Sequence, residues 1–288
     1  MKKVLSALLT ILLVVSISGC QNNTPDEPKG IETTYNTFGE FDGAEYKIEN
    51  GELYGRYRNS MGLFGTDKTE YFEEWTKINI NANNIIHLEV CSGILLYLTS
   101  DGKVYVLGDI GELEKLILFE GDTTDYITTP VLLFVDCKTV SLGVRFALFL
   151  KNDNTLWFVG ESLNGQSTQV KEVVLEPSKI ADNVLFAKAF GYTSSWIDSE
   201  YNLYLCGDNS YGQIGNGKMG CGYPTMFKDI VEEPFCVLKG CACFSVEQSY
   251  NGILSVYAET EKGESYTWGG EYGATPVLTN ESNTIFNK

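Results

Sequence analysis

The chain has 288 residues and a formal net charge of −17; 43% of its residues are apolar and 12% are aromatic. This composition supplies ample material for a packed core. The negative charge repels phosphate backbones and anionic headgroups, so we expect no nucleic-acid partner. One interpretation of the acidity is that it keeps an envelope protein soluble. The more specific alternative is that the acidic surface binds a basic partner protein.

The first twenty residues have the pattern of an export signal. Two lysines precede an apolar run from Val4 to Ile17, which is too short for a membrane-spanning helix. The run ends in Ile17-Ser18-Gly19-Cys20, which resembles a bacterial lipobox. In lipoproteins the cysteine of this motif is acylated with diacylglycerol, and a peptidase then cuts before it. The alternative is an ordinary signal peptide with an incidental cysteine.

We expect Cys20 to be the lipid attachment site. Its acyl chains, palmitate among them, would hold the protein on the extracytoplasmic side of the bacterial cell membrane. The residues that follow are polar and include two prolines, which is typical of a flexible tether. The predicted organisation is a signal peptide at 1–19, the lipidated cysteine and tether at 20–34, and a single repeat domain at 35–288.

The repeat domain alternates short apolar segments with glycine, asparagine and aspartate. β-branched and aromatic residues are abundant, and no long window has a convincing helical period. The pattern therefore predicts an all-β domain. Clear examples of the expected strands are Ile85–Val90, Leu95–Leu98, Arg145–Leu150, Val184–Phe190 and Gly252–Tyr257.

One stretch, LYLCGDNSYGQIGNG from Leu203 to Gly217, recurs in weaker form along the chain. Its apolar half reads as a strand, and its glycines reach positive φ without steric cost, which marks a sharp exit from that strand. The residues equivalent to Gly207 are Tyr57, Gly108, Gly160 and Gly269, at intervals of 51, 52, 47 and 62 residues. A period near fifty indicates repeated supersecondary units.

These copies resemble the regulator-of-chromosome-condensation repeat. Residues 101–105 (DGKVY) match the first half of its unit, residues 207–209 (GDN) with 212–215 (GQIG) match the second, and Trp268-Gly269 supplies its tryptophan–glycine step, where the strongest copy has Cys206. The resemblance implies a β-propeller. The structural hallmark residues that it marks are Gly108, Gly160, Gly207, Asn209, Gly212, Gln213, Gly215, Trp268 and Gly269.

The expected propeller has about five four-stranded units, although seven blades are usual in the resembled family. Polar or proline-marked outer strands are expected before the hallmark strands, at Trp75–Ile78, Pro130–Phe134, Pro177–Ile180 and Pro234–Leu238. The first unit then lacks an opening strand, and one strand is left over after the last unit. Because propellers close by pairing strands from the two chain ends, we expect Pro276–Leu278 to join the blade that contains Leu53–Tyr57.

Seven cysteines remain besides Cys20, an odd number that cannot form a complete set of disulfides. Most lie in apolar strand segments, where cysteine behaves as a small buried hydrophobic residue. The group Cys221, Cys236, Cys241 and Cys243 lacks the paired C-x-x-C spacing of zinc sites. Export to an oxidising compartment favours one disulfide among these four over a metal, and we expect no cofactor.

Signatures of catalysis are weak, and we expect no enzyme. Residues 212–218 fit the phosphate-binding pattern G-x-x-x-x-G-K, but Met219 follows instead of serine or threonine, and Gly220–Pro224 cannot open the helix that would hold a phosphate. His87 lies in a strand segment without a nucleophile signature. With 38 carboxylates a glycosidase-like pair stays open, although no spacing points to one.

The expected function is therefore a membrane-anchored lipoprotein whose monomeric propeller is a protein-binding scaffold, with recognition through loops on one face. Within the resembled family, an extracytoplasmic bacterial β-lactamase inhibitor binds protein through aromatic loop residues. By analogy Tyr211 and Tyr272, which lie in hallmark turns, are the candidate anchors. The alternatives are binding of carbohydrate or cell-wall polymer through exposed rings, and a glycan-cleaving enzyme with carboxylates in the central channel.

Overall fold

The computed structural model describes residues 38–41, 43–59, 62–65, 70–80, 84–109, 126–168, 171–220, 229–248 and 253–279. The expected signal peptide, the lipid site at Cys20 and the tether lie outside these residues, and so does Cys221. Within the described part, no helix has the length and apolar character needed to cross a membrane.

The described chain forms five four-stranded antiparallel sheets, here called blades 1 to 5, each made of four consecutive strands. Blades 1 and 2 contain β1 (Phe38–Phe41), β2 (Ala44–Glu49), β3 (Glu52–Arg58), β4 (Tyr71–Lys77), β5 (Ile85–Cys91), β6 (Ile94–Thr99), β7 (Val104–Gly108) and β8 (Ile127–Phe134). Blade 3 contains β9 (Cys137–Gly143), β10 (Phe146–Lys151), β11 (Leu156–Ser162) and β12 (Lys171–Ala181). Blades 4 and 5 contain β13 (Val184–Phe190), β14 (Thr193–Asp198), β15 (Leu203–Asp208), β16 (Ile230–Leu238), β17 (Cys241–Gln248), β18 (Leu254–Thr260), β19 (Ser265–Trp268), the 3₁₀ turn η2 (Gly270–Tyr272) and β20 (Val277–Thr279).

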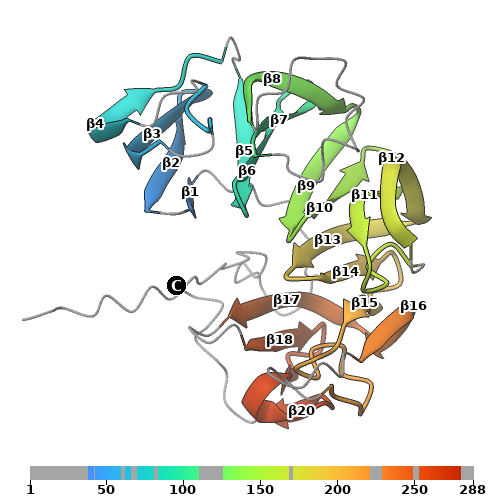
Figure 1. Cartoon of the computed structure of the whole chain (residues 1–288). Helices are drawn as coiled ribbons and strands as arrows, with labels where there is room; N and C mark the ends of the chain where they lie inside the picture. The colour runs from blue at the N-terminus through green and yellow to red at the C-terminus, as the bar shows by residue number, and fades with distance from the viewer. Residues whose placement is uncertain are drawn as a thin grey trace, which may run out of the picture.

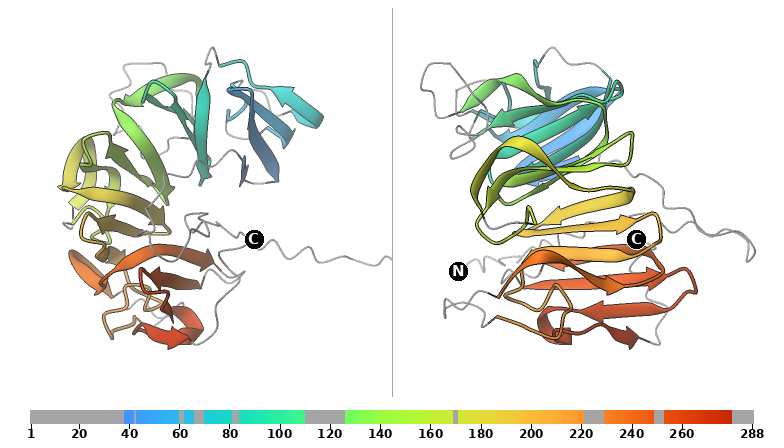
Figure 2. Two further views of the ribbon diagram at one scale, coloured as in Figure 1. Left: turned by 180° about the vertical axis from the view of Figure 1, so that it is seen from behind. Right: turned by 90° about the vertical axis from the view of Figure 1, so that its right-hand side faces the viewer.

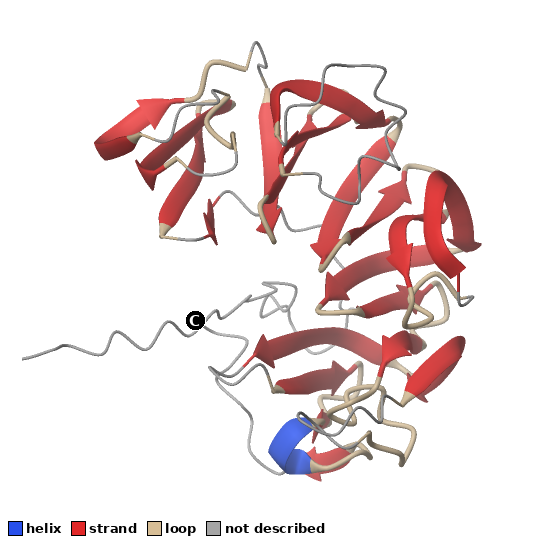
Figure 3. Ribbon diagram, viewed as in Figure 1, coloured by secondary structure: helices blue, strands red, loops and turns tan. Residues whose placement is uncertain are grey.

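The five blades lie in an open arc with blade 1 at one end and blade 5 at the other (Figure 1). Nearly all regular structure is strand (Figure 3), which confirms the all-β propeller prediction. The first strands of blades 1, 2, 3 and 4 contact one another in turn, so they lie at the inner side of the arc. The fourth strands form its outer side.

The hydrophobic core lies between neighbouring blades, because each sheet turns apolar side chains toward the next sheet. One cluster joins blades 1, 2 and 3 and includes Tyr46, Leu88 and Phe149. A second cluster joins blades 3 and 4, and a third joins blades 4 and 5 around Trp268. Adjacent pairs of blades thus share a core, as in repeat proteins whose units contact only their neighbours.

A repeated pair of backbone hydrogen bonds fastens each blade to the next. The hairpin between the second and third strands of a blade offers a carbonyl to the first strand of the following blade; the donor–acceptor pairs are Ile85→Gly51, Cys137→Gly102, Val184→Asn154 and Cys241→Tyr201, at 2.7–3.0 Å. The residue just before that first strand accepts a bond from the corresponding hairpin of its own blade, in the pairs Ser100→Asn84, Asn152→Asp136, Ser199→Asn183 and Glu261→Gly240. All eight accepting residues have positive φ, so glycine and asparagine recur there.

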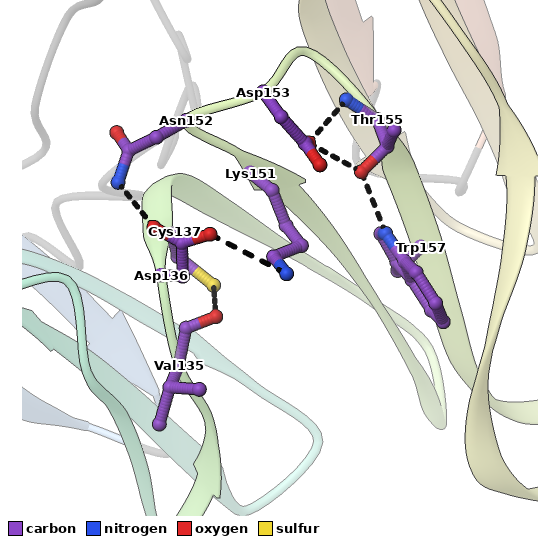
Figure 4. A network of polar contacts seen from close by, with 8 residues as sticks. All are labelled: Val135, Asp136, Cys137, Lys151, Asn152, Asp153, Thr155 and Trp157. Carbon is purple, nitrogen blue, oxygen red and sulfur yellow. Dashed lines mark hydrogen bonds and ion pairs between the residues drawn. The ribbon is translucent and has the colours of Figure 1, made fainter.

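Side chains reinforce the entry of the chain from blade 2 into blade 3 (Figure 4). Asn152 donates from Nδ2 to Asp136 Oδ1 at 3.0 Å, and Lys151 Nζ lies 3.4 Å from the same carboxylate. Nearby, Trp157 Nε1 donates to Thr155 Oγ1 at 2.8 Å. The side-chain bonds to Asp136 hold the β10–β11 hairpin of blade 3 to the chain that enters its first strand from blade 2.

The predicted closure of the ring is wrong. β20 pairs with β19 inside blade 5, with Leu278 opposite Tyr266, and β3 pairs with β2 and β4. Within each blade, the proline-marked strand comes after the hallmark strand, whereas the sequence pattern predicts it before that strand. The predicted boundaries between blades are therefore displaced by one strand. Each blade uses four consecutive strands, so none of the strands in the described residues is left to close the ring, and a gap separates blades 1 and 5 (Figure 2).

Candidate interaction surface

The hallmark glycines stand where the third strand of a blade touches the hairpin between its first two strands. Gly108, Gly160 and Gly207 have φ of +102°, +130° and +117°. A Cβ on Gly207 would lie 2.4 Å from Tyr192 O, and one on Gly108 would lie 2.2 Å from Gly93 O. Only glycine allows this approach, after which the next residue donates its N–H to the same hairpin.

Asn209 and Gln213 hold the loop that follows the hallmark strand of blade 4. The Asn209 side chain accepts from Ile214 N at 2.9 Å and donates to Lys218 O at 2.9 Å and to Asp229 at 2.6 Å. Both residues are fully buried. The glycines of the supposed phosphate-binding pattern therefore form a turn held by asparagine, and no helix follows before residue 220, where the described segment ends.

Two other blades contain the same loop although their sequences match it poorly. In blade 1, Asn59 Oδ1 accepts from Phe64 N at 3.1 Å, as Asn209 does from Ile214. In blade 3, Gln166 Oε1 accepts from Asn164 N at 2.9 Å, as Gln213 does from the N–H of Tyr211. The repeat is thus more regular in structure than in sequence.

The loops also fix each blade to the next one. Trp268 Nε1 donates to Gln213 O at 2.8 Å, across the boundary of blades 4 and 5. At the boundary of blades 3 and 4 the equivalent residue is Cys206, whose Sγ lies 3.7 Å from Gln166 O. Burial raises the pKa of this thiol to about 12, so it stays protonated and able to donate. Gln213 and Trp268 are thus joint residues between blades, whereas Gly108, Gly160 and Gly207 hold the third strand to a hairpin of its own blade.

The remaining predicted groups do not form a chemical centre. Cys236, Cys241 and Cys243 are free thiols, so the expected disulfide does not occur among these three, and Cys221 lies outside the described residues. No cluster of His, Cys, Asp or Glu side chains in the described segments is arranged to hold a metal. The two candidate anchors differ: Tyr211 is half-buried, whereas Tyr272 is exposed and its ring lies 5.8 Å from that of Tyr257.

His87 belongs to a buried polar group at the inner side of the arc. Its Nε2 lies 3.0 Å from Val140 O and 3.4 Å from Glu89. Lys188 Nζ of blade 4 reaches the same Glu89 of blade 2 at 3.3 Å, past the first strand of blade 3. Burial opposes ionisation of Glu89, yet Lys188 and His87 together keep its pKa below the usual value. This group connects the two halves of the arc.

A surface that the sequence reading missed lies on the side of blade 1 turned away from blade 2. Lys47 Nζ stands 4.9 Å from the ring centre of Trp75 and 5.7 Å from that of Tyr54. The Arg56 guanidinium stands 4.6 Å from both Trp75 and Tyr57. Cations at this distance are attracted to the faces of aromatic rings, and they hold the rings in place. We call this surface, together with Phe38 and Tyr71, the cation–aromatic face.

The cation–aromatic face ends in two exposed rings. Phe38, which is 53% exposed, meets Trp75 edge-on at 6.5 Å, and Tyr71, which is 68% exposed, lies 6.0 Å from Tyr57. Glu45 and Glu49 pair with Arg56 and Lys47 on the same side of the sheet. The alternation of charged and aromatic residues along β2, β3 and β4 was the sequence signal for this face.

This face differs from the boundaries between blades. Cross-strand partners share a side of a sheet, so the register places Lys47, Tyr54 and Lys77 together on one side of blade 1. The opposite side carries Ala44 and Leu53, both buried against blade 2. Blade 1 thus presents an apolar side to its neighbour and a charged, aromatic side to the gap.

No protein-family model matches the sequence. Among solved structures, yeast RCC1 (Prp20) in its complex with Kap60 resembles the chain with a TM-score of 0.63 at 19% identity, over 83% of this chain and 59% of that one. The fold is that of an RCC1-repeat β-propeller. Prp20p from Saccharomyces cerevisiae gives 0.61 at 20% identity (83% and 61% covered), and human WBSCR16 gives 0.59 at 18% (83% and 65%). The chain therefore spans 59–65% of the length of these RCC1-type proteins, and the likeness is one of fold.

Proposed function

We propose that the protein is a lipoprotein, anchored through Cys20 on the outside of the bacterial cell membrane, whose RCC1-type propeller binds another protein and catalyses no reaction. The observation that carries the binding role is the cation–aromatic face of blade 1. Rings held by cations lose little conformational freedom on binding, and aromatic residues with arginine are the usual anchors of protein interfaces. The exposed rings of Phe38 and Tyr71 supply the contact area.

The fold supports the same role. Prp20, which is similar in fold, has been described in complex with Kap60 and as binding Gsp1p and histones, all of them proteins. Functions of this kind reside in surfaces placed on a rigid scaffold. The joints described above provide that rigidity, since each blade is fixed to the next by backbone bonds and a shared core.

The anchor is tested by fractionation. Cys20→Ser is expected to remove acyl labelling and to release the chain from membranes into the soluble fraction. The binding role is tested by cross-linking the full chain in its native membrane and identifying the protein that it captures. Phe38→Ser with Tyr71→Ser should abolish the capture, whereas Leu132→Ser with Val135→Ser, at exposed apolar residues of blade 2 and the turn after it, should leave it unchanged.

Two results would contradict the proposal. Unchanged membrane fractionation of Cys20→Ser would remove the anchor. Retention of the chain on purified cell-wall polymer, lost in the Phe38 and Tyr71 variant, would assign the cation–aromatic face to carbohydrate instead of protein.

A further inference from the structure

The outer strands of the five blades share one position that is proline in all but the first. On the third strand of each blade, the residue two places before the hallmark residue pairs with a residue of the outer strand. The shared position is the one directly before that paired residue of the outer strand. From blade 1 to blade 5 it holds Trp75, Pro130, Pro177, Pro234 and Pro276. Because proline has no N–H, four blades complete their ladders without a hydrogen bond donated from this position.

The same prolines protect the outer edges of four blades. An edge strand offers unpaired backbone groups to other chains, and proline is one of the residues that prevent such pairing. Blade 1 differs, because Trp75 has a backbone N–H at the position that is proline in the other four blades. β4 is the last strand of its sheet, and the shift of its register with β3 at Glu73–Trp75 leaves extended residues on both sides of a bulge for a peptide to pair with.

The charge of β4 indicates which peptide it suits. Glu70, Glu73 and Glu74 are exposed, and none of them forms an ion pair within the described residues. Lys77, the lysine of this strand, is held by a hydrogen bond from its Nζ to Glu52 Oε1. Free carboxylates on the outer edge attract a strand that carries lysine or arginine.

We propose that β4 binds an extended, basic segment of a partner protein, which pairs with β4 as a fifth strand of blade 1. Backbone hydrogen bonds supply affinity in this mode of recognition, and side chains supply specificity. Basic side chains of the added strand pair with the β4 glutamates, and its other side chains lie near the exposed ring of Tyr71. The proposal rests on the protein-binding role proposed above and gives that role a partner chemistry.

The test uses the full chain in detergent and a fluorescent eight-residue peptide of alternating lysine and valine. We expect saturable binding by fluorescence anisotropy, weakened by salt. Methylating every second backbone nitrogen of the peptide should weaken binding at least about tenfold, because it removes the donors that an added strand requires. Trp75→Pro should have the same effect, whereas Trp75→Phe, which keeps the N–H and a ring, should retain binding.

Blade 4 supplies a matched control, because Glu232-Glu233-Pro234 of β16 occupies the positions of Glu73-Glu74-Trp75. Glu73→Gln with Glu74→Gln should weaken binding several-fold, roughly as expected for two lost ion pairs, and Glu232→Gln with Glu233→Gln should not. Equal loss in both double variants would reveal unspecific attraction and overturn the proposal. So would full binding of the methylated peptide, which does not depend on any variant folding.

A second copy of the chain is the other candidate for this edge. A dimer in size-exclusion chromatography that Trp75→Pro abolishes would assign the edge to self-association and overturn the proposal. Failure of the peptide to bind, with protein capture still dependent on Phe38 and Tyr71, would remove the edge proposal and leave the proposed function standing.

Discussion

Blades 1 and 4 contain the same loop built from different side chains. Blade 4 has glycine at the hallmark position and a Gln213 whose carbonyl accepts from Trp268 of the next blade. In blade 1 the hallmark position holds Tyr57, at a φ of +73°. The comparison shows that the asparagine bond and the turn that follows it are preserved while the joint chemistry varies: each asparagine side chain accepts from the backbone five residues later, and a glycine-to-glycine turn follows in both loops.

The joints differ in the same way. Leu63, in the loop of blade 1, and Leu107, in the next hallmark strand, are fully buried and apolar. They occupy the places of Gln213 and Trp268. A joint between blades can thus be filled by apolar packing or by a satisfied buried hydrogen bond, and both solutions keep neighbouring sheets in contact.

The largest expected effect is at the hallmark glycine of blade 4. Gly207→Ala places a Cβ 2.4 Å from Tyr192 O at a φ of +117°, so the strand must move. We expect a loss of about 4 kcal/mol in the free energy of unfolding, measured by urea denaturation. Gly263→Ala is the control, because its φ is also positive but no atom lies within 4 Å of the new Cβ, and it should cost about 1 kcal/mol.

Removing Glu89 tests whether blades 2 and 4, in the two halves of the arc, are coupled. Glu89→Gln leaves Lys188 without its partner carboxylate and should cost about 3 kcal/mol at pH 7. The pKa of Glu89 is lower in the folded chain than in the unfolded one, so its contribution is present above the unfolded value and is lost as pH falls through the folded value.

The stability difference between the wild type and Glu89→Gln should therefore be complete at pH 7, begin to shrink below pH 4.5, the ordinary pKa of this carboxyl, and disappear only below its folded pKa; denaturation at a series of pH values from 7 downward measures it. A pH-independent difference would contradict this assignment. If the pair couples the blades, the variant should also unfold in two separable steps, one for blades 1 and 2 and one for blades 4 and 5.

The polar joint should be weakened by Trp268→Phe, which keeps an aromatic ring but leaves Gln213 O without its donor. We expect a loss of about 2 kcal/mol in calorimetry or urea unfolding. Cys206→Ala, at the equivalent place in blade 4, removes a longer and weaker sulfur contact of 3.7 Å and should cost less. A larger loss for Cys206→Ala would mean that packing, not the hydrogen bond, governs these joints.

Tyr57→Gly compares the two hallmark positions directly. Glycine removes the strain of a positive φ, which should stabilise the fold by about 1 kcal/mol. The substitution also removes the contact between Arg56 and the tyrosine ring, which should destabilise it by a similar amount. The free energy of unfolding should change by no more than about 1 kcal/mol in either direction. A loss as large as that of Gly207→Ala would show that Tyr57 is required for the fold of blade 1.

The smallest effect is expected at Lys77, whose exposed side chain pairs with Glu52 on the cation–aromatic face. Lys77→Ala should leave stability almost unchanged, because exposed ion pairs contribute little. Thermal unfolding of this variant beside the wild type provides the measurement. A clear fall in the unfolding temperature would indicate that the charges of this face stabilise blade 1 as a network.

The sequence by itself determined the period near fifty, the strand-rich character and the positions of the five hallmark residues. These features are local: glycine is required wherever a Cβ would strike a neighbouring carbonyl, and strand residues alternate within a few positions. The sequence also located the proline-marked strands, but it assigned them to the wrong blade. A periodic pattern does not show where one unit ends and the next begins. Moving every blade boundary by one strand leaves the predicted strands and turns unchanged, so the sequence cannot reveal the shift.

Only the tertiary structure decided the phase of the blades, the open ring and the cation–aromatic face. The Glu89–Lys188 contact joins residues 99 positions apart, and no local pattern anticipates it. Only the strand pairing showed that Trp75 occupies the position that is proline in the other four blades. Such relations depend on which strands become neighbours, and that choice is made by the packing of whole sheets against one another.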